Sequence, residues 1–213
     1  KWYDVDLLSL AGVGYIVADK CIADERLQLL PMPVYEHRLA TWGARSFTEK
    51  IRGYLRSENP GRRLYVYRNP AALPRSFLVP SIRLFPDQVA LWHALGQARL
   101  EDLVLAVYVS ETDFPGDGKV DGGPVDGHVT VLEERKDFRR FVVNADRPAV
   151  LVISDQFYPW WHWRVNGEET KAFPAYGVFQ GLVVPAGQST VEGSYQPACG
   201  KILNVWPSSV RCD

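Results

Sequence analysis

The most regular alternation of apolar and polar residues in this chain is the run WHWRV, residues 161–165. In an extended strand its two tryptophans and its valine share one face, while the histidine and the arginine share the other. Asn166-Gly167 follows at once, and this dipeptide is well suited to the two positive φ angles of a tight hairpin turn. We therefore predict a strand with Trp161 and Trp163 in the core, followed by a two-residue hairpin.

Further strands are expected on both sides of this hairpin. Residues 150–153, Val-Leu-Val-Ile, are apolar without interruption, which is typical of a strand covered on both faces. Residues 185–188, Pro-Ala-Gly-Gln, form a second turn signal. The expected strands are 128–133, 138–144, 150–153, 161–165, 170–175, 177–184 and 189–195. From residue 149 on, they predict an antiparallel meander with one buried face.

The first half of the chain mixes helical and extended patterns. Residues 4–12 suit a short helix that is stopped by Gly12, and residues 13–18 suit a buried strand. The run Ser46-Phe47-Thr48-Glu49 has the form of a capping box, and it opens a helix that should end near Glu58. The remaining predictions are a helix over 87–95 and strands over 27–34, 34–39, 64–67, 76–79 and 104–109.

These elements predict an α+β fold, with a mixed α/β N-terminal half and an antiparallel, jelly-roll-like β-sandwich as its C-terminal half. The expected parts are 1–112, a connector at 113–127, the sandwich at 128–197 and a tail at 198–213. The connector holds five Gly, two Pro and four Asp. A calcium loop is the alternative for these aspartates. Their spacing does not fit the EF-hand pattern, so a mobile connector is preferred.

Composition excludes several classes of function. The chain has 213 residues, of which 46% are hydrophobic and 23% charged, as is ordinary for a globular protein with a real core. A net charge of −1 provides no basic surface for nucleic acid. No apolar run approaches the ~20 residues that span a bilayer, and no signal peptide is visible. Because the chain begins at Lys1, we expect it to be a fragment of a longer protein.

Metal and cofactor signatures are absent from the sequence. It has three cysteines and four scattered histidines, without a CxxC motif or a Cys/His cluster of zinc spacing. Cys199 and Cys212 are near enough in sequence to close a small loop, and a bridge between them is expected if the compartment is oxidising. No metal and no cofactor is therefore predicted.

Three blocks of the sequence carry a family resemblance. The first is LLSLAGVGYIV at 7–17 and the second is YRNPAALPRSFLV at 67–79. The third runs from SDQFYPWW at 154–161 through VNG at 165–167 and VPAG at 184–187 to YQP at 195–197. Together they resemble the last extracytoplasmic region of YfhO-type bacterial membrane proteins, which are related to the C-type membrane glycosyltransferases that use polyprenyl-phosphate-linked sugars. Where that family usually has Tyr-Pro-Gly-Trp, Trp160 stands in place of the glycine.

The resemblance implies a soluble extracytoplasmic domain, periplasmic or at the cell surface, that is tethered to the membrane-embedded part of the same protein. In C-type transferases the catalytic acids lie in loops near the membrane helices, which this chain does not contain. The domain is therefore expected to be an accessory or acceptor-positioning module in cell-envelope glycosylation, with a saccharide or cell-envelope polymer as its other partner. The alternatives are a free-standing carbohydrate-binding module and a purely structural domain.

No catalytic site is predicted within this chain. A glycosidase needs two carboxylates that face one site, and Asp155, Glu168 and Glu169 are candidates only by proximity in sequence. The two glutamates follow the hairpin turn and are expected to be solvated. Asp155 is the best acid in the chain, and we expect its carboxylate to accept backbone N–H groups in the corner that follows. Nucleophile-elbow, Walker and Rossmann patterns are absent.

Five residues are candidates for ligand binding. Tyr158, Trp160 and His162 suit a sugar-stacking surface, although closely spaced aromatic residues are also the ordinary filling of a sandwich core. Trp160 and His162 are expected to be exposed, because their parity is opposite to that of the core-facing tryptophans. Asp155 lies beside them in sequence. Arg75 suits an anion ligand, but the preferred interpretation is that its guanidinium locks a turn by binding carbonyls or a carboxylate.

The end of the chain is expected to lie outside the membrane. Residues 198–213 hold too few apolar side chains to span a bilayer, and Pro207 stops a helix there. Either the chain was cut at a membrane helix or the native chain ends in this tail, and the polar last residues favour the second. We expect Ile202 or Trp206 to pack on the sandwich.

Overall fold

The computed structural model describes residues 3–18, 20–30, 65–116, 120 and 122–197. The chain divides into two compact units. The larger unit combines Lys1–Gly12 with Leu73–Asp213, and the smaller unit is Val13–Ala72. Within the residues described, no helix has the length and apolar character needed to cross a bilayer.

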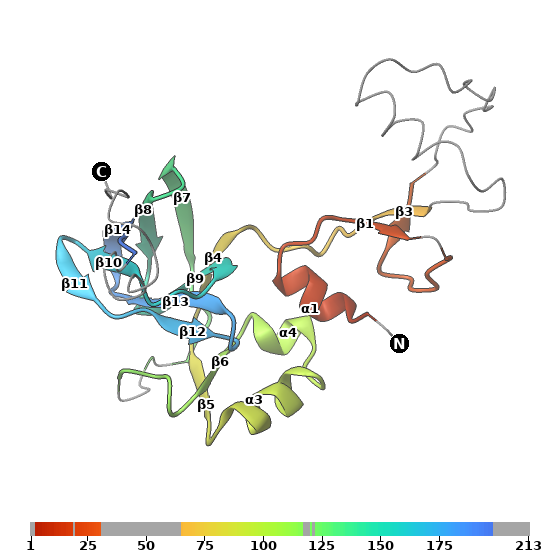
Figure 1. Ribbon diagram of the computed structural model, residues 1–213, viewed down its shortest axis with the longest axis horizontal. Coiled ribbons are helices and arrows are strands. Elements are labelled where there is room, and N and C mark those ends of the chain that lie inside the picture. The colour runs from red at the N-terminus through yellow and green to blue at the C-terminus, as the bar shows by residue number, and fades with distance from the viewer. Residues whose placement is uncertain (1–2, 19, 31–64, 117–119, 121, 198–213) are drawn as a thin grey trace, which may run out of the picture. The chain divides into compact units, whose positions relative to one another are not determined.

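Two antiparallel sheets form most of the larger unit (Figure 1). The five-stranded sheet has the order β11 (Glu168–Thr170), β10 (Trp161–Val165), β14 (Gly187–Tyr195), β8 (Phe138–Ala145), β7 (Gly127–Glu134). The four-stranded sheet has the order β12 (Phe173–Ala175), β13 (Phe179–Val184), β9 (Ala149–Gln156), β4 (Ser76–Val79). The fold is thus mostly antiparallel sheet with few helices, in agreement with a β-sandwich-like arrangement.

The strands do not form the single meander expected from the sequence. The chain changes sheet between β8 and β9, between β9 and β10, between β11 and β12, and between β13 and β14. Strands that follow one another pair as hairpins at β7–β8, β10–β11 and β12–β13. The prediction of a meander was wrong because alternation shows which side chains are buried, whereas the choice between two sheets depends on contacts distant in sequence.

A core made by side chains of both sheets fills the space between them. Phe141 of β8 and Trp163 of β10 pack there with Leu151 of β9 and Leu182 of β13. The two sheets therefore pack face to face. Each such side chain stabilises the fold by about 1.5–3 kcal/mol relative to an exposed position.

β9 is buried on both faces, and its uninterrupted apolar run predicted this. Leu151 and Ile153 belong to the core between the sheets. Val150 and Val152 alternate with them and belong to a second core cluster, on the opposite face of the four-stranded sheet. The prediction for residues 150–153 is confirmed.

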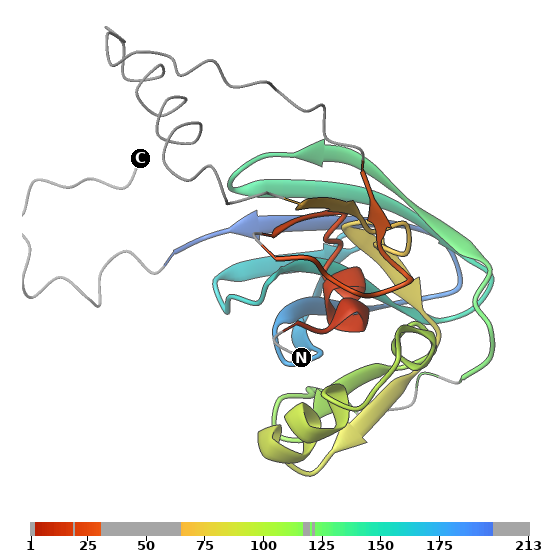
Figure 2. The same ribbon diagram turned by 90° about the vertical axis from the view of Figure 1, so that its right-hand side faces the viewer.

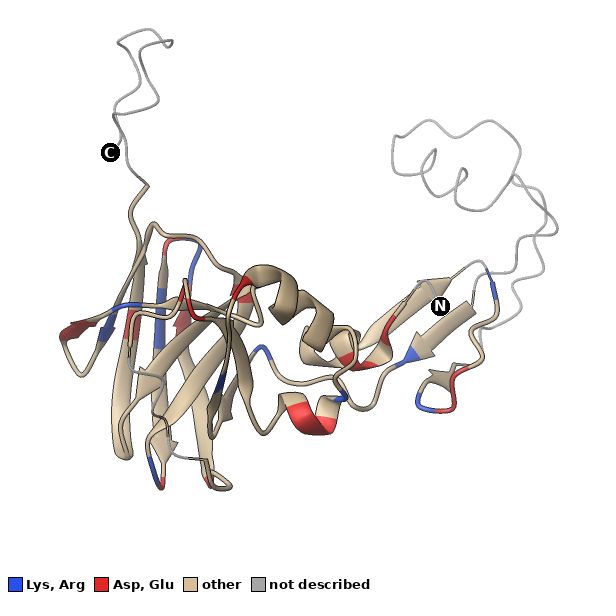
Figure 3. Cartoon of the chain, turned by 90° about the horizontal axis from the view of Figure 1, so that it is seen from below, with Lys and Arg blue, Asp and Glu red and all other residues tan. Residues whose placement is uncertain are grey.

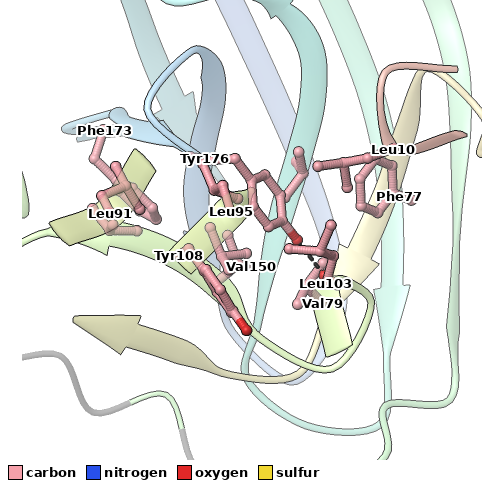
Figure 4. Packing of buried hydrophobic residues seen from close by; sticks show 14 of the residues in the cluster. Leu10, Phe77, Val79, Leu91, Leu95, Leu103, Tyr108, Val150, Phe173 and Tyr176 are labelled. Atoms are coloured by element: carbon pink, nitrogen blue, oxygen red, sulfur yellow. Dashed lines mark hydrogen bonds between the residues drawn. The ribbon is translucent and has the colours of Figure 1, made fainter. Parts of the chain in front are cut away.

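A layer of helices and parallel strands covers this opposite face. It consists of α1 (Val5–Leu10), α3 (Gln88–Leu95), α4 (Leu100–Leu103) and the parallel pair β5 (Ile82–Phe85) and β6 (Val107–Ser110). Leu91 of α3 and Leu103 of α4 are buried in one cluster with Val79 and Val150 of the sheet (Figure 4). In Figure 2 the yellow-green segment with α3 and the green hairpin β7–β8 lie on opposite sides of this sheet.

The ends of two helices follow the signals in the sequence. Asp4 precedes α1, and its side chain accepts the backbone N–H of Asp6 at 2.9 Å. Gly12, with a φ of +73°, follows the end of α1. Asp87 caps α3 by accepting the N–H of Ala90 at 2.8 Å. The helices predicted over 4–12 and 87–95 are confirmed, whereas α4 and β5 were not expected.

Tyr176 fixes the turn between β12 and β13 against the helical layer. Its φ is +52° and that of Gly177 is +73°, so a bulky residue occupies the left-handed region, which is uncommon. The side chain is buried, and its hydroxyl donates a hydrogen bond to the carbonyl of Leu103 (Figure 4). Its backbone N–H donates to the carbonyl of Tyr108 at 2.8 Å. Burial raises the pKa of the phenol.

The hairpin predicted at Asn166-Gly167 is confirmed. Their φ angles are +52° and +86°, and Val165 and Glu168 are cross-strand partners on either side of the turn. The Asn166 carbonyl oxygen Oδ1 also accepts the backbone N–H of Thr190 on β14 at 2.9 Å. The turn is therefore tied to the neighbouring strand as well as closed on itself.

β7 lies at one edge of the five-stranded sheet, and β8 is its partner strand. The pairing register shifts between Val131 and Glu133, so Leu132 is an additional residue on the β7 side. Val131 and Leu132 are both exposed. A bulge of this kind bends a strand and increases its local twist.

The smaller unit contains an antiparallel sheet of β1 (Tyr15–Ala18), β3 (Tyr65–Arg68) and β2 (Gln28–Leu29), in that order. Tyr67 is buried, and its hydroxyl accepts the N–H of Ile22 at 2.9 Å. The expectation of a buried strand at 13–18 was wrong, because Tyr15 and Val17 are 65% and 63% exposed. Both lie on the sheet face opposite to that of Tyr67, whose partner is Ile16.

Several predictions lie outside the described residues. These are the strand over 34–39, the helix opened by the capping box, and the tail with the Cys199–Cys212 bridge. Of the strand expected over 27–34, the described part contains β2. The predicted division at residues 112, 127 and 197 stays a prediction.

Candidate functional site

The aromatic corner, residues 157–161, leads the chain from β9 in one sheet to β10 in the other. It is a tight turn, since the N–H of Trp161 donates to the carbonyl of Tyr158 at 3.2 Å, with Pro159 as the first of the two central residues. The N–H of Phe157 donates to the carbonyl of Val178 at 2.7 Å, next to β13. The carbonyl of Trp160 accepts the N–H of Gln196 at 2.9 Å. The corner is thus held from both sheets.

The inward side of the corner is a stack of aromatic rings. Trp163 is 2% exposed, and its indole N–H donates to Gln180 Oε1 at 2.8 Å. The ring of Trp161 stacks on Trp163 with 5.5 Å between centroids and lies 5.6 Å from Tyr195. The prediction that Trp163 is core is confirmed. Trp161 packs against the same core but is only half-buried, because it lies where the sandwich ends.

Four charged side chains meet at this end of the sandwich, and we call them the arginine–carboxylate cluster: Arg75, Glu134, Arg139 and Asp155. Asp155, near the end of β9, forms ion pairs with both arginines. Arg139 of β8 also binds Glu134 of β7, with 3.1 Å between Nη1 and Oε1. The side chains of Arg139 and Asp155 are 14% and 19% exposed, whereas that of Arg75 is 66% exposed.

The cluster is coupled to the aromatic stack. The guanidinium carbon of Arg139 lies 5.4 Å from the centroid of the Trp161 ring, within the range of a cation–π contact. The hydrogen bond and the negative charge of Asp155 raise the pKa of Arg75. Among the described residues, Arg139 Nε is buried without a hydrogen-bond partner.

The partners of Asp155 differ from those expected. Backbone N–H groups of the corner were predicted, but its carboxylate binds two arginine side chains instead. The prediction missed Arg139, whose position in β8 shares the inward parity of Phe141 and Val143. A charged residue at a core-facing position needs a counter-charge, and this parity is the sequence signal that could have revealed it. Arg75 binds a carboxylate, that of Asp155. The preferred interpretation, that such binding locks a turn, stays a prediction.

The corner and the strand ends beside it also carry exposed or half-buried polar and aromatic side chains: Gln156, Tyr158, Trp160, His162 and Gln196. Tyr158 is 42% exposed, and its hydroxyl donates to Gln156 Oε1 at 3.4 Å. Trp160 was expected to be exposed, but it is half-buried, because its ring packs near Tyr195 at an interplanar angle of 72°. His162 is exposed, as expected.

Ser194 of β14 lies beside two of these residues. It is the cross-strand partner of His162 on β10. Its hydroxyl accepts a hydrogen bond from the Gln196 amide at 3.2 Å. The sequence analysis did not single out Gln156 or Gln196.

No family model, no curated protein and no solved structure matches this chain. Within the described part of the chain, no three His, Cys, Asp or Glu side chains are grouped so that they could hold a metal ion.

The five predicted residues fall into two groups. Arg75 and Asp155 bind each other in the cluster. Tyr158, Trp160 and His162 follow Asp155 along the chain, in the aromatic corner and at the start of β10. Both groups therefore lie near the point where β9 ends and β10 begins.

Proposed function

We propose that this chain is a non-catalytic accessory or acceptor-positioning domain of a YfhO-like membrane protein, located on the extracytoplasmic side and acting in cell-envelope glycosylation. The three sequence blocks that resemble that family support it. The observation that carries the non-catalytic part is that Asp155, the acid beside the aromatic corner, is bound by two arginines.

A catalytic carboxylate must reach the substrate, and it must either exchange a proton or attack the sugar. Arg75 and Arg139 occupy the oxygens of Asp155, so this carboxylate is already bound within the protein. Glu168 and Glu169 are exposed beside the hairpin tip, where Glu169 lies 3.9 Å from Arg164. These three acids do not provide the facing pair that glycoside chemistry requires.

The membrane-embedded part of the same protein is the proposed partner. A domain without a reactive pair can still contribute by holding an acceptor close to a site built elsewhere, since positioning alone raises a reaction rate strongly. The alternative is a free-standing carbohydrate-binding module. The two functions differ in whether the gene encodes apolar spans next to this region.

Location is tested on the full-length protein. Alkaline phosphatase fused after Pro197 should be active, because this enzyme acquires its disulfides only outside the cytoplasm. Green fluorescent protein fused at the same position and exported through the Sec pathway should stay dark. A dark phosphatase fusion together with a bright fluorescent one would place the domain in the cytoplasm and contradict the proposal.

For the fold we also propose a jelly-roll-like connection of the two sheets. The repeated crossings, β8 to β9, β9 to β10, β11 to β12 and β13 to β14, support it. An experimental structure is the test. Strand connections that follow an immunoglobulin-type order would contradict the proposal.

A further inference from the structure

We propose that the exposed face of the β1–β3–β2 sheet in the smaller unit is the docking site of a segment of the same chain, residues 46–58, in helical form. We call it the open face, and it is defined by four exposed or half-buried side chains: Tyr15 and Val17 of β1, and Val66 and Arg68 of β3. Its occupant is argued from the burial of the sheet and from the chain that joins β2 to β3.

The opposite face of this sheet is covered by chain that the structure describes. Tyr67 is buried on that side, and its hydroxyl accepts the N–H of Ile22 at 2.9 Å. Ile22 and Leu27, in the segment between β1 and β2, are 6% and 7% exposed. Tyr15 and Val17 point the other way and are 65% and 63% exposed. The described residues therefore cover one side of the sheet and leave the other open.

The open face is apolar apart from one charge. The three strands contain no Lys, Arg, Asp or Glu except Arg68, at the end of β3 (Figure 3). Arg68 is the cross-strand partner of Tyr15, and Val66 is the partner of Val17, so the four side chains share one face. A sheet with an apolar face is stabilised by burying that face against a second layer.

The connection from β2 to β3 supplies the occupant. It covers residues 31–64, outside the described residues, and belongs to the smaller unit together with the sheet. The N–H of Leu30 donates to the carbonyl of Val66 at 2.9 Å, so the connection leaves the sheet beside the strand to which it returns. Antiparallel neighbours can be joined by two residues, and this connection is therefore long enough to contain a covering element.

Residues 46–58 have the sequence pattern of such an element. A capping box begins them, and their apolar residues recur at helical spacing: Phe47, Ile51, Tyr54 and Leu55. Isolated helices shorter than about 12–15 residues are marginal in water, and most of their stability in proteins comes from packing an apolar stripe. The one charge that continues the stripe is Glu58, and the one charge of the open face is Arg68, of opposite sign.

Photocrosslinking within the full chain tests the contact. Tyr15 is replaced by p-benzoylphenylalanine, and the cross-linked peptides are identified by mass spectrometry. We expect intramolecular cross-links from position 15 to residues 46–58. The matched control carries the same replacement at Leu29, which is 51% exposed and pairs with Tyr67 on the opposite face. It should not cross-link to this segment.

Hydrogen exchange, measured by mass spectrometry, tests whether the contact stabilises the segment. Val17→Asp places a charge on the open face and should speed the exchange of the backbone amides of residues 47–58 about tenfold or more, because the burial of one valine is lost. Leu29→Asp is the matched control and should leave these rates unchanged.

Two results would overturn the inference. The first is a failure of position 15 to cross-link to residues 46–58, including the case in which it cross-links only to a second molecule. The second is equal exchange of residues 47–58 in Val17→Asp and in the parent chain. If Val17→Asp also speeds exchange in β3, the sheet itself has opened, and Val17→Ser takes its place under the same criterion.

Discussion

Replacement of Asp155 by Asn removes the counter-charge of Arg139 while keeping the shape of the side chain. Arg139 is 14% exposed, points into the end of the sandwich and lies over Trp161. Breaking a buried ion pair by removing one partner costs about 3–5 kcal/mol. Because water still reaches part of both side chains, we expect Asp155→Asn to lower the free energy of unfolding by about 2–3 kcal/mol.

Arg75→Gln is the matched control for this change. It breaks the other ion pair of the same carboxylate, but the Arg75 side chain is 66% exposed. Exposed pairs contribute about 0–1 kcal/mol, so the control should stay within that range. The double variant Asp155→Leu with Arg139→Met replaces the inner pair by apolar side chains and should recover most of the loss, to within about 1 kcal/mol of the parent chain.

Urea unfolding followed by tryptophan fluorescence measures all four proteins, since Trp161 and Trp163 adjoin the cluster. Equal m-values are required before midpoints are converted into free energies. Equal losses in Asp155→Asn and Arg75→Gln would refute the assignment of the buried charge to Arg139. A stable Asp155→Asn with an unstable double variant would show that the cluster is held by shape rather than by charge.

Three further predictions concern the core. Tyr176→Phe should cost about 1–2 kcal/mol at neutral pH, because the Leu103 carbonyl loses its donor. Burial raises the pKa of Tyr176 above the value of about 10 in the unfolded chain. The neutral phenol therefore stabilises the fold fully below about pH 10, and this stabilisation is lost as the pH rises further. In thermal melts between about pH 8 and 11, the melting temperature should fall less for Tyr176→Phe than for the parent chain. Gly193→Ala should lower the free energy of unfolding, measured in urea, by about 1–3 kcal/mol, because its Cβ would lie 2.5 Å from the Trp163 ring. Its control, Gly14→Ala, should be close to neutral, because a Cβ at Gly14 meets nothing within 4 Å. Trp163→Ala should cost about 3–5 kcal/mol and Trp160→Ala clearly less, and equal losses would contradict the burial of the two rings.

Local signals in the sequence predicted local structure well. Asn166-Gly167 specified its turn, Asp87 began its helix, and the apolar run at 150–153 indicated a strand covered on both faces. Each of these depends on residues adjacent in the chain. The turn at Tyr176-Gly177 was not expected, because tyrosine is rarely found at positive φ and is stabilised here by contacts with Leu103 and Tyr108.

Non-local features could not be predicted in the same way. The pairing of β4 with β9 joins segments about 75 residues apart, and no pattern within either strand specifies the other. The candidate site shows the same limit. His162 is exposed, as its parity predicted, whereas Trp160 of the same parity is half-buried. Arg75 and Arg139 became partners of one carboxylate only through the sheet arrangement.

The bulge in β7 affects whether molecules of this protein aggregate through their sheet edges. A long, flat edge strand with exposed valine and leucine is a template on which another chain can add a strand, and such addition is the first step toward fibrils. At Leu132 the register of β7 is broken, and the two residues that follow it are glutamates. An incoming strand would lose its hydrogen-bond ladder at the bulge and meet negative charge beyond it. The exposed apolar pair is therefore tolerated at the edge, because the sheet terminates there instead of growing into a fibril.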